Sequence, residues 1–389
     1  MKKIVFLIRT LARSGGGGAE KQLSMLAKAL SIKGYEVSIL CFYPDADSEA
    51  EFSDTPIKLL SLEKQDRWDM VGFFWRLFQQ LKSIQADVLH SYLPDSNILT
   101  IFLKPLFPTT KMVWGIRHSN WGDSQLNIER GNKLSKWVDS TIYVEQKLAR
   151  FADLIIANSY AGQKYHLSKG FPEESLIVIP NGIDVDHFQP DPEAGAITRQ
   201  EWGVSGDRIL IGLVGRLHPM KDHSTFLKAA ALILQERQNV HFVCVGGEQQ
   251  QDYAIQLYKL ANQLGIADQV IWAGARVDML EVYNALDILV SASAFGEGFS
   301  NAISEAMACG KPCVVTDVGD SGSIVGNQGI VIPPGDPQAL KTAVMQLITE
   351  LTTENYAQGK IRQRIVENFS VPQLLFKTEL TLLSLFNNN

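Results

Sequence analysis

The sequence has little cysteine and no long apolar run, and both shortages limit what the protein can be. Its 389 residues include four cysteines, none of them in a C-x-x-C pair, which is too few for a disulfide framework and fits a reducing, cytoplasmic setting. No apolar stretch approaches the roughly 20 residues that span a bilayer. A hydrophobic content of 46% with 20% charged residues is typical of a folded globular chain rather than a disordered one.

The amino terminus, MKKIVFLIRTLARSGGGG, resembles a signal peptide only at first sight. Arg9 and Arg13 interrupt the short apolar run, and no small-residue cleavage site follows it. We therefore interpret this run as the first strand of a folded core.

Charge is divided unevenly along the chain. Residues 1–150 contain four more basic than acidic residues, whereas the remainder contains ten more acidic than basic residues. The first part is the better candidate to face phosphates or an anionic lipid surface, although a solvated surface without any partner has the same balance. The net negative charge of the chain and the lack of a basic surface with aromatic residues disfavour a nucleic-acid-binding protein.

Short β-branched runs alternate with longer periodic segments, and the alternation occurs in two series. This pattern predicts parallel sheets with helices on both faces. The expected strands are 2–8, 35–42, 86–92, 111–118, 154–159 and 176–182 in the first series, and 209–217, 240–247, 269–276, 287–293, 312–318 and 329–335 in the second. The expected helices of the first series are 19–33, 69–84, 96–103 and 133–150.

Two such series predict an α/β protein with two Rossmann-like domains whose parallel sheets face a central cleft. We assign residues 1–188 to the first domain and 189–371 to the second, with the joint in the polar stretch 186–200. A last helix within 372–389 can pack back on the first domain. Ligands of such sheets bind beyond the carboxyl ends of the strands, so the loops there are the informative ones.

Four consecutive glycines, residues 15–18, separate the first expected strand from the first helix. Glycines such as Gly16 and Gly17 let the backbone approach a ligand closely, and the helix start offers free N–H groups to an anion. The dinucleotide fingerprint G-x-G-x-x-G fails because its last position falls on Glu20 or Lys21. A loop without any ligand is the alternative.

Two basic residues follow the first strand of the second series. Arg216 and Lys221, in GRLHPMKDH, can present a guanidinium fork and a point charge to a diphosphate. Two solvated surface cations are the alternative, since exposed bases in loops commonly have no partner.

The stretch AFGEGFSNAISEAMACGKP, residues 294–312, places Glu297 before a helix start and Glu305 inside the helix. Ser300 or Asn301 can cap this helix, and the amides from Gly298 onward would then point at an anion. A metal site is disfavoured because the stretch contains no aspartate or histidine. A glycosidase-type pair of carboxylates is conceivable, but such a pair flanks the cleaved glycosidic bond from different elements of the fold. We therefore favour two hydroxyl-binding carboxylates, one for a sugar and one for a ribose.

With these residues in place, the chain resembles the retaining nucleotide-sugar glycosyltransferases of the GT-B fold, specifically glycosyltransferase family 4. The resemblance covers essentially the whole chain and includes the family's E-x₇-E signature, here Glu297 and Glu305. Its other segments are GGGGAEK, NSYAGQKYHLSKGFPEESLIVIPNGIDVDHFQP, LVGRLHPMKD, VGG, AGARVDMLEVYNALDILVSAS and EGFSNAISEAMACGKPCVVTDVG.

The resemblance implies a role for each matching position. Glu297 is expected near the reacting sugar, Glu305 at the ribose hydroxyls, and Arg216 with Lys221 at the leaving diphosphate. Backbone amides are expected to cradle the donor at Gly298, Phe299 and Ser300. The remaining expected donor contacts are Gly16 and Gly17 beside the donor, His118 against the donor sugar, and Arg276 and Val277 at the nucleobase.

This chain departs from the family at two positions: Asp320 stands where a second glycine is frequent, and Ser300 where proline is frequent. Neither change removes a charged group of the expected site. The loop around Asp320 is expected to differ locally.

The resemblance further implies retaining transfer of a hexose-type sugar from a nucleotide-diphosphate sugar, UDP being favoured, without metal or cofactor. The acceptor would be a glycan or lipid-linked saccharide in surface polysaccharide biosynthesis. It would bind the first domain, and the nucleotide-sugar donor would bind the second. The alternative is a GT-B nucleotide-sugar epimerase or sugar phosphorylase, although no cofactor-lysine motif of a phosphorylase is found. The base, the sugar and the acceptor are not determined by the sequence.

The segment RWDMVGFFWRLFQQLKS, residues 67–83, is rich in aromatic and basic residues. It is either a core helix that covers the first sheet or an interfacial helix that contacts the inner surface of a membrane. The first reading is the commoner one, and both are carried forward.

Overall fold

The computed structural model divides the chain into two compact units, which we call the first and the second unit. The first consists of Met1–Gly182 with Val371–Asn389, and the second of Ile183–Ser370. The structure describes residues 2–11, 17–43, 50–66, 68–117, 133–248, 250–351 and 358–387, and the side chains of all of these except 133–140. Residues 183–188, assigned above to the first domain, thus lie in the second unit.

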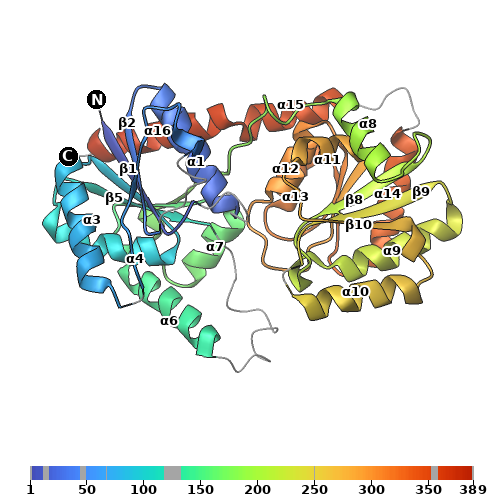
Figure 1. The fold of residues 1–389 in the computed structure, drawn as a ribbon, viewed down its shortest axis with the longest axis horizontal. Helices are drawn as coiled ribbons and strands as arrows, with labels where there is room; N and C mark the ends of the chain where they lie inside the picture. The colour runs from blue at the N-terminus through green and yellow to red at the C-terminus, as the bar shows by residue number, and fades with distance from the viewer. Residues whose placement is uncertain are drawn as a thin grey trace. The chain divides into compact units, whose positions relative to one another are not determined.

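The first unit contains a seven-stranded parallel sheet in the order β3-β2-β1-β4-β5-β6-β7. Its strands are β1 Lys3–Ile8, β2 Glu36–Cys41, β3 Lys58–Ser61, β4 Val88–Tyr92, β5 Lys111–Ile116, β6 Leu154–Ala157 and β7 Leu176–Val178. The parallel α/β architecture predicted from the sequence is confirmed (Figure 1). The edge strand β3 was not predicted.

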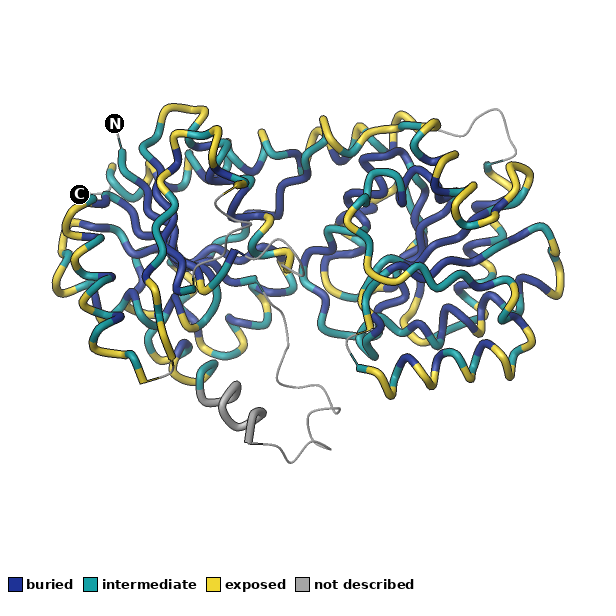
Figure 2. Tube along the Cα trace, viewed as in Figure 1, coloured by how far each residue is buried: buried dark blue, intermediate teal, exposed yellow. Residues whose placement is uncertain are grey.

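Helices cover both faces of this sheet. They are α1 Gly18–Ile32, α3 Met70–Ile84, α4 Pro94–Leu103, α6 Lys133–Leu148, α7 Tyr160–Ser168 and α16 Val371–Asn387. Alternation along β1 assigns the faces: Phe6 packs with α1 and α16, whereas Leu7 packs with α3 and the end of α4. Figure 2 shows the strands as the most deeply buried part of the unit.

Helix α3 is apolar on two sides. Its Phe73, Leu77 and Leu81 are buried against the sheet, as a core helix requires. On the other side, Val71 is 86% and Trp75 60% exposed. The two readings of this segment are therefore compatible, because the helix completes the core and still leaves a large apolar surface outside.

The final helix belongs to the first unit although it follows the second in sequence. Leu374 and Leu382 of α16 are buried in the same cluster as α1, and the Tyr35 hydroxyl donates a hydrogen bond of 2.9 Å to Glu379 Oε1. A hydrogen bond joins the two ends of the second unit: the Ile183 N–H donates to the Phe369 carbonyl at 2.7 Å.

The second unit contains a six-stranded parallel sheet in the order β10-β9-β8-β11-β12-β13. Its strands are β8 Ile209–Val214, β9 Val240–Val245, β10 Val270–Gly274, β11 Ile288–Ser291, β12 Cys313–Thr316 and β13 Ile330–Ile332. Its helices are α8 Pro192–Glu201, α9 His223–Glu236, α10 Gln251–Gln263, α11 Met279–Ala285, α12 Asn301–Ala308, α13 Ser321–Val325, α14 Pro337–Leu351 and α15 Gln358–Phe369.

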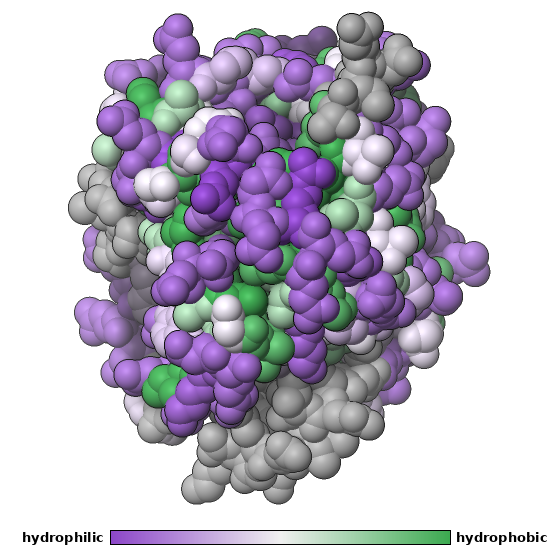
Figure 3. Space-filling view, turned by 90° about the vertical axis from the view of Figure 1, so that its right-hand side faces the viewer, coloured by the Kyte–Doolittle hydropathy of each residue, from purple (hydrophilic) through white to green (hydrophobic). Residues whose placement is uncertain are grey.

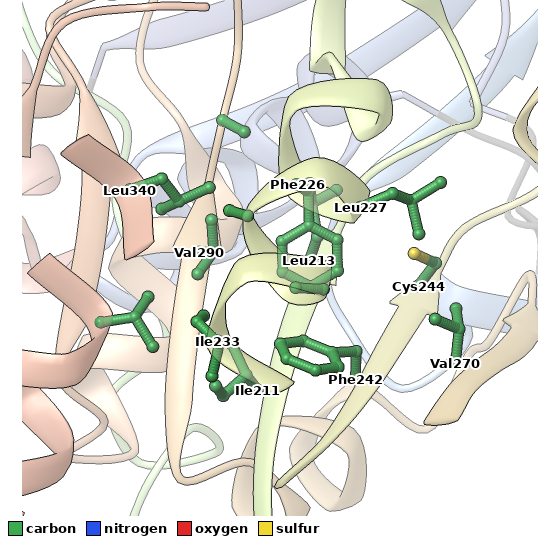
Figure 4. Packing of buried hydrophobic residues seen from close by; sticks show 14 of the residues in the cluster. Ile211, Leu213, Phe226, Leu227, Ile233, Phe242, Cys244, Val270, Val290 and Leu340 are labelled. Carbon is green, nitrogen blue, oxygen red and sulfur yellow. The ribbon is translucent and has the colours of Figure 1, made fainter. Parts of the chain in front are cut away.

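Two clusters of buried side chains, one on each face, hold these helices to the sheet. Helices α9, α10 and α14 pack on one face, where Phe226 meets Phe242 with ring centroids 5.8 Å apart (Figure 4). Helices α11, α12, α13 and α15 pack on the other. The polar stretch expected to be the joint contains α8. Asp191 is the N-cap residue of this helix, and its side chain accepts a hydrogen bond of 3.0 Å from the Ala194 N–H.

The described part of the chain contains no helix whose length and hydropathy would let it traverse a bilayer. The face of the molecule in Figure 3 is mostly hydrophilic, with small hydrophobic areas between charged and polar side chains. All four cysteines are buried, and none of them forms a disulfide.

Candidate functional site

The candidate site of the second unit lies where the strand order reverses. Strands β8 and β11 are neighbours, with Leu213 paired to Val290, and the chain leaves them toward opposite edges of the sheet. Ligands of open parallel sheets bind at such a switch point, beyond the carboxyl ends of the strands. Arg216 and Lys221 follow β8 and Glu297 follows β11, so the fold brings both predicted groups to this point.

Lys221 and Glu297 form an ion pair, with the ammonium also donating a hydrogen bond to Glu297 Oε1. Both side chains are largely withdrawn from solvent, at 16% and 8% exposure. The stem of Lys221 passes so close to Gly215 that a Cβ there would lie 3.1–3.2 Å from three of its carbons. Gly215 therefore allows the lysine to reach the glutamate.

The charge state of Glu297 follows from its surroundings. Burial by itself raises the pKa of this carboxyl, but it is outweighed by the charge and hydrogen bond of Lys221 together with the hydrogen bond from Ser293 and the charge of Arg216. The pKa of Glu297 is therefore held below its ordinary value, and the group is an anion at neutral pH. Two cations and one carboxylate thus share this position.

Neighbouring loops support the segment that carries Glu297. The Ala294 N–H donates to the Met220 carbonyl at 2.8 Å, and the Asp320 N–H donates to the Gly298 carbonyl at 3.1 Å. Gly319 has φ +63°, and a Cβ there would lie 2.5 Å from the Glu297 carbonyl oxygen. Only glycine combines this left-handed conformation with so close an approach.

Glu305 lies in the second turn of α12 and is 9% exposed. Its Oε2 accepts a hydrogen bond of 2.7 Å from the hydroxyl of Tyr283, which is itself buried. Burial and then the charge of Glu305 raise the pKa of Tyr283 well above its ordinary value. The tyrosine is therefore a neutral donor to the carboxylate.

The start of α12 differs in part from the prediction. Ser300, one of the two residues expected at the cap, is the N-cap residue, but its side chain accepts no capping hydrogen bond. Phe299 is buried in the core and its ring lies 5.3 Å from that of Phe369. Only the backbone of Phe299 is thus a candidate for ligand contact.

Arg276 has its guanidinium occupied within the protein. Nε donates to Asp278 Oδ1 at 2.8 Å and Nη2 donates to Glu201 Oε2 at 2.9 Å, and further bonds join it to both carboxylates. These partners raise the pKa of Arg276 above its ordinary value. The neighbouring Val277 is 95% exposed, so in this loop it is Val277 that is open to a ligand.

Two predicted residues, Gly16 and His118, lie outside the described residues. Gly17 is the N-cap residue of α1 and has an extended backbone.

Sequence reasoning missed the hydroxyl donors of both glutamates. Ser293 donates to Glu297 Oε1 at 2.6 Å and precedes it by four residues, a spacing that carries no motif. Tyr283 lies 22 residues before Glu305, and only the packing of α11 beside α12 brings the two together.

Models of two glycosyltransferase families match the chain. "Glycosyltransferase Family 4" matches residues 16–187 and "Glycosyl transferases group 1" matches residues 208–350, so the two matches span most of the sequence. The chain belongs to the GT-B glycosyltransferases of family 4. The predicted family and fold are confirmed, and the protein is a glycosyltransferase.

Individual relatives of this glycosyltransferase differ in how much of them is matched. A D-inositol 3-phosphate glycosyltransferase of Thermobispora bispora is 29% identical, with 86% of this chain and 82% of that protein covered. A UDP-Gal:alpha-D-GlcNAc-diphosphoundecaprenol alpha-1,3-galactosyltransferase of Escherichia coli is 29% identical over 50% of this chain and 51% of that protein. Several other curated relatives are likewise matched over about half of their length.

The crystal structure of Anabaena HepE in complex with UDP has the same fold. Its TM-score is 0.82 at 24% identity, and the superposition covers 99% of this chain and 100% of that chain.

Cation-binding groups do not assemble in the described part of this glycosyltransferase, where no three His, Cys, Asp or Glu side chains come together as a metal site would require. The sequence does contain two Asp-x-Asp triplets, a motif common in cation-dependent glycosyltransferases, at 45–47 and 184–186. The first lies outside the described residues. In the second, Asp184 Oδ1 accepts from the backbone N–H groups of Asp186 and His187.

Proposed function

We propose that this glycosyltransferase moves a hexose-type sugar, with retention of anomeric configuration, from a UDP-sugar to a hydroxyl of a glycan or lipid-linked saccharide. The reaction would serve surface polysaccharide biosynthesis. The observation that carries the proposal is the group formed by Arg216, Lys221 and Glu297 at the β8–β11 switch point. A leaving diphosphate finds two cations there, and the sugar finds a carboxylate beside them.

Neutralising the leaving diphosphate is the main chemical task of this group. Charge that develops on the phosphate as the glycosidic bond breaks would be met by the Lys221 ammonium and the Arg216 guanidinium. Such preorganised donors typically contribute about 10²–10³ in rate each. The N–H groups in the first turn of α12 add partial positive charge on the same side.

Retaining transfer asks little of a protein base. In front-face transfer, the departing phosphate oxygen accepts the proton of the acceptor hydroxyl while Glu297 stabilises the cationic sugar. Glu305 would bind the ribose hydroxyls and the backbone near Val277 the nucleobase. His118 would position the sugar rather than remove a proton.

The choice of UDP and of a lipid-linked acceptor draws on relatives. HepE crystallised with UDP and with UDP-glucose, and the E. coli relative is named for a UDP-galactose donor and a diphosphoundecaprenol-linked acceptor. The T. bispora relative is named for a different acceptor, D-inositol 3-phosphate. The acceptor is therefore the part of the proposal that most needs an experiment.

A panel of UDP-, GDP- and ADP-sugars tests the donor by thermal shift and by slow hydrolysis. We expect stabilisation by a UDP-hexose, release of UDP, and a product with the anomeric configuration of the donor by NMR. K221M should lower kcat by about 10²–10³, whereas K228M, an exposed lysine of α9, should leave kcat unchanged. Conversion of the donor alone to an epimer or a sugar phosphate would favour the epimerase or phosphorylase alternative.

Transfer is proposed to need no divalent cation, because no aspartate or histidine accompanies the two glutamates in residues 294–312. Activity should persist in EDTA at nearly the untreated rate. A rate that collapses in EDTA and returns with Mg²⁺ or Mn²⁺ would refute this part of the proposal.

A lipid-linked acceptor is made at a membrane, and we propose peripheral contact of the first unit with its cytoplasmic face. The exposed side of α3 supports this contact. Val71 and Trp75 are 86% and 60% exposed and lie about one helical turn apart on α3, and Trp68, just before the helix, is 77% exposed. Trp at an apolar surface is typical of interfacial binding.

Aromatic side chains with basic neighbours lie on the face of the first sheet that α3 covers. The rings of Trp75, Phe78 and Phe107 follow one another at centroid distances of 5.7 and 5.5 Å. Lys82 lies 6.0 Å from the Phe78 ring and Arg150 lies 4.9 Å from the Phe151 ring. Aromatic anchors with cations beside them fit an anionic lipid surface better than a protein partner.

Flotation with vesicles of phosphatidylglycerol and phosphatidylcholine tests the contact. The V71S/W75S variant should lose most of the binding seen at low salt, because both anchors leave the stripe. The F376S/L380S variant is the matched control: it also removes two exposed apolar side chains, each 62% exposed on α16, and should bind as the unmodified protein does. No binding of the unmodified protein at low salt would exclude the contact.

A further inference from the structure

Each of the two glutamates receives a hydrogen bond from a neutral hydroxyl that lies outside the E-x₇-E segment. Ser293 Oγ donates to Glu297 Oε1 at 2.6 Å, and Tyr283 Oη donates to Glu305 Oε2 at 2.7 Å. Ser293 and Tyr283 are both almost fully buried. A hydrogen bond to an ionised group is worth about 1.5–3 kcal/mol, more than one between neutral groups.

We propose that Ser293 and Tyr283 are positioning residues of the glycosyl-transfer site, which rests on the function proposed above. Ser293 keeps Glu297 in place for the donor sugar, and Tyr283 fixes Glu305 for the ribose of the nucleotide. Neither hydroxyl touches the reacting atoms. Each acts through the carboxylate to which it donates.

The need for Ser293 follows from what Lys221 must do. Lys221 and Ser293 both donate to Oε1 of Glu297, and in the absence of ligand the lysine supplies most of the attraction. A bound diphosphate competes for the same ammonium with two negative charges. Once Lys221 turns toward the phosphates, Ser293 still donates to Glu297, and it brings no charge that would oppose the cationic sugar.

Ser293 is itself held in position from the next strand. The Thr316 hydroxyl, at the end of β12, donates to the Ser293 carbonyl at 2.7 Å. This bond fixes the backbone immediately after β11, and with it the direction from which the serine hydroxyl approaches Glu297. The anchor for the carboxylate is therefore the sheet and not the loop alone.

Tyr283 reaches Glu305 from a rigid support. Its ring lies in the core cluster between the sheet and helices α11 and α12, 5.8 Å from the ring of Phe188. A ring packed on all sides cannot follow a moving partner. The hydroxyl thus holds Glu305 in one rotamer, which lowers the entropy that the carboxylate loses when the ribose binds.

Steady-state kinetics with UDP-glucose test the part of the proposal that concerns Ser293. S293A should lower kcat by about 10- to 100-fold, the value of one charge-assisted bond, with KM changed less than about threefold. The effect is expected mainly on kcat because Glu297 loses its anchor only after the diphosphate has engaged Lys221. S205A, which removes a serine hydroxyl that donates to Asp207 at 2.6 Å on the surface, is the control.

Calorimetric titration with UDP and with 2′-deoxy-UDP tests the part that concerns Tyr283. The unmodified protein should prefer UDP, and Y283F should weaken UDP binding by about tenfold while reducing the preference over 2′-deoxy-UDP. Y35F is the matched control, since Tyr35 donates to Glu379 in the first unit at 2.9 Å. It should change neither affinity.

The outcomes separate the inference from the proposed function. If Y283F weakens both nucleotides by the same factor, or S293A behaves as S205A does, the hydroxyls are structural and the inference fails while the function stands. If the unmodified protein neither binds UDP nor hydrolyses any sugar of the panel, the proposed donor is wrong. A Tyr283 variant that binds normally but unfolds earlier would also overturn the positioning role.

Discussion

At the scale of single residues, the feature that most needs an explanation is a buried ion pair. Lys221 and Glu297 are 76 residues apart in sequence and are largely withdrawn from solvent. Desolvating two charges commonly costs as much as their attraction returns, so stability alone is a weak reason to retain such a pair. A pair that separates when a diphosphate arrives gives a functional reason, because the charges are then already assembled and dehydrated.

The pH dependence of stability should report this pair. The pKa of Glu297 is lowered, so its ionisation stabilises the second unit above the ordinary value of 4.5, and this contribution is lost as the pH falls through the lower folded value. K221M removes the positive charge that offsets the burial of Glu297, so the pKa of this carboxyl rises. The ionised carboxylate then destabilises the fold as the pH rises through this higher pKa. We expect a loss of about 3 kcal/mol at pH 7.5 and a much smaller loss near pH 4.

Urea unfolding of K221M and of the unmodified protein at both pH values measures this difference. The K221M/E297Q double variant is the control, since it removes both charges and should recover most of the stability at pH 7.5. An equal loss at the two pH values would mean that Lys221 contributes packing only.

At the scale of elements, what the sequence could and could not predict has a physical pattern. Strands buried on both faces are continuous apolar runs, so the interior strands of both sheets were predicted near their observed bounds. β3, at the edge, consists of four residues with no fully buried member and lacks that signal. The polar composition of 186–200 predicted a joint without a helix, and the structure has α8 there. Asp191 and Pro192 form a recognisable helix start.

The same limit applies to the candidate site. The residues of the E-x₇-E segment are local in sequence and were found there, as were Arg216 and Lys221 beside their strand. Hydrogen-bond partners that come from other elements, such as Tyr283 on α11, leave no local pattern. Residue type suggested Ser300 or Asn301 as the cap of α12, and Ser300 is the N-cap residue, but its side chain makes no capping hydrogen bond, since a helix can begin without one.

Helix α16 provides a test of how a distant element completes a domain. Leu374 is buried against α1 and the first sheet, whereas Leu380 on the same helix is 62% exposed. L374A should destabilise the first unit by about 2–5 kcal/mol through lost burial and a cavity. L380A should change the stability by less than about 0.5 kcal/mol.

Thermal unfolding followed by tryptophan fluorescence measures both variants, because Trp114 is buried in the first unit. UDP binding should be unaffected in either variant, as the proposed nucleotide site lies in the second unit. Equal destabilisation by L374A and L380A would show that α16 does not depend on this cluster for its attachment.

At the scale of the whole molecule, the two units differ in how the chain makes them. The first is discontinuous, because α16 returns to it after the second has been completed. The second is one uninterrupted stretch with its own clusters on both faces of the sheet, and its ends are joined by the Ile183–Phe369 hydrogen bond. A segment with its own core and adjoining ends is expected to fold alone.

This organisation predicts that residues 183–370, produced alone, fold and bind the nucleotide. The groups proposed to bind the diphosphate, the ribose and the nucleobase, namely Arg216, Lys221, Glu305 and the backbone near Val277, all lie in this stretch. The dissociation constant of the fragment for UDP, measured by calorimetry, should therefore be within about threefold of that of the full chain, since a change of 1.4 kcal/mol would already give tenfold. Sugar transfer should be absent, because the first domain, which the family resemblance implies as the acceptor-binding one, is missing. The K221M version of the fragment is the control and should bind UDP at least tenfold more weakly. A fragment that folds, as judged by cooperative unfolding, yet fails to bind UDP while the full chain binds it would mean that the first unit supplies essential nucleotide contacts.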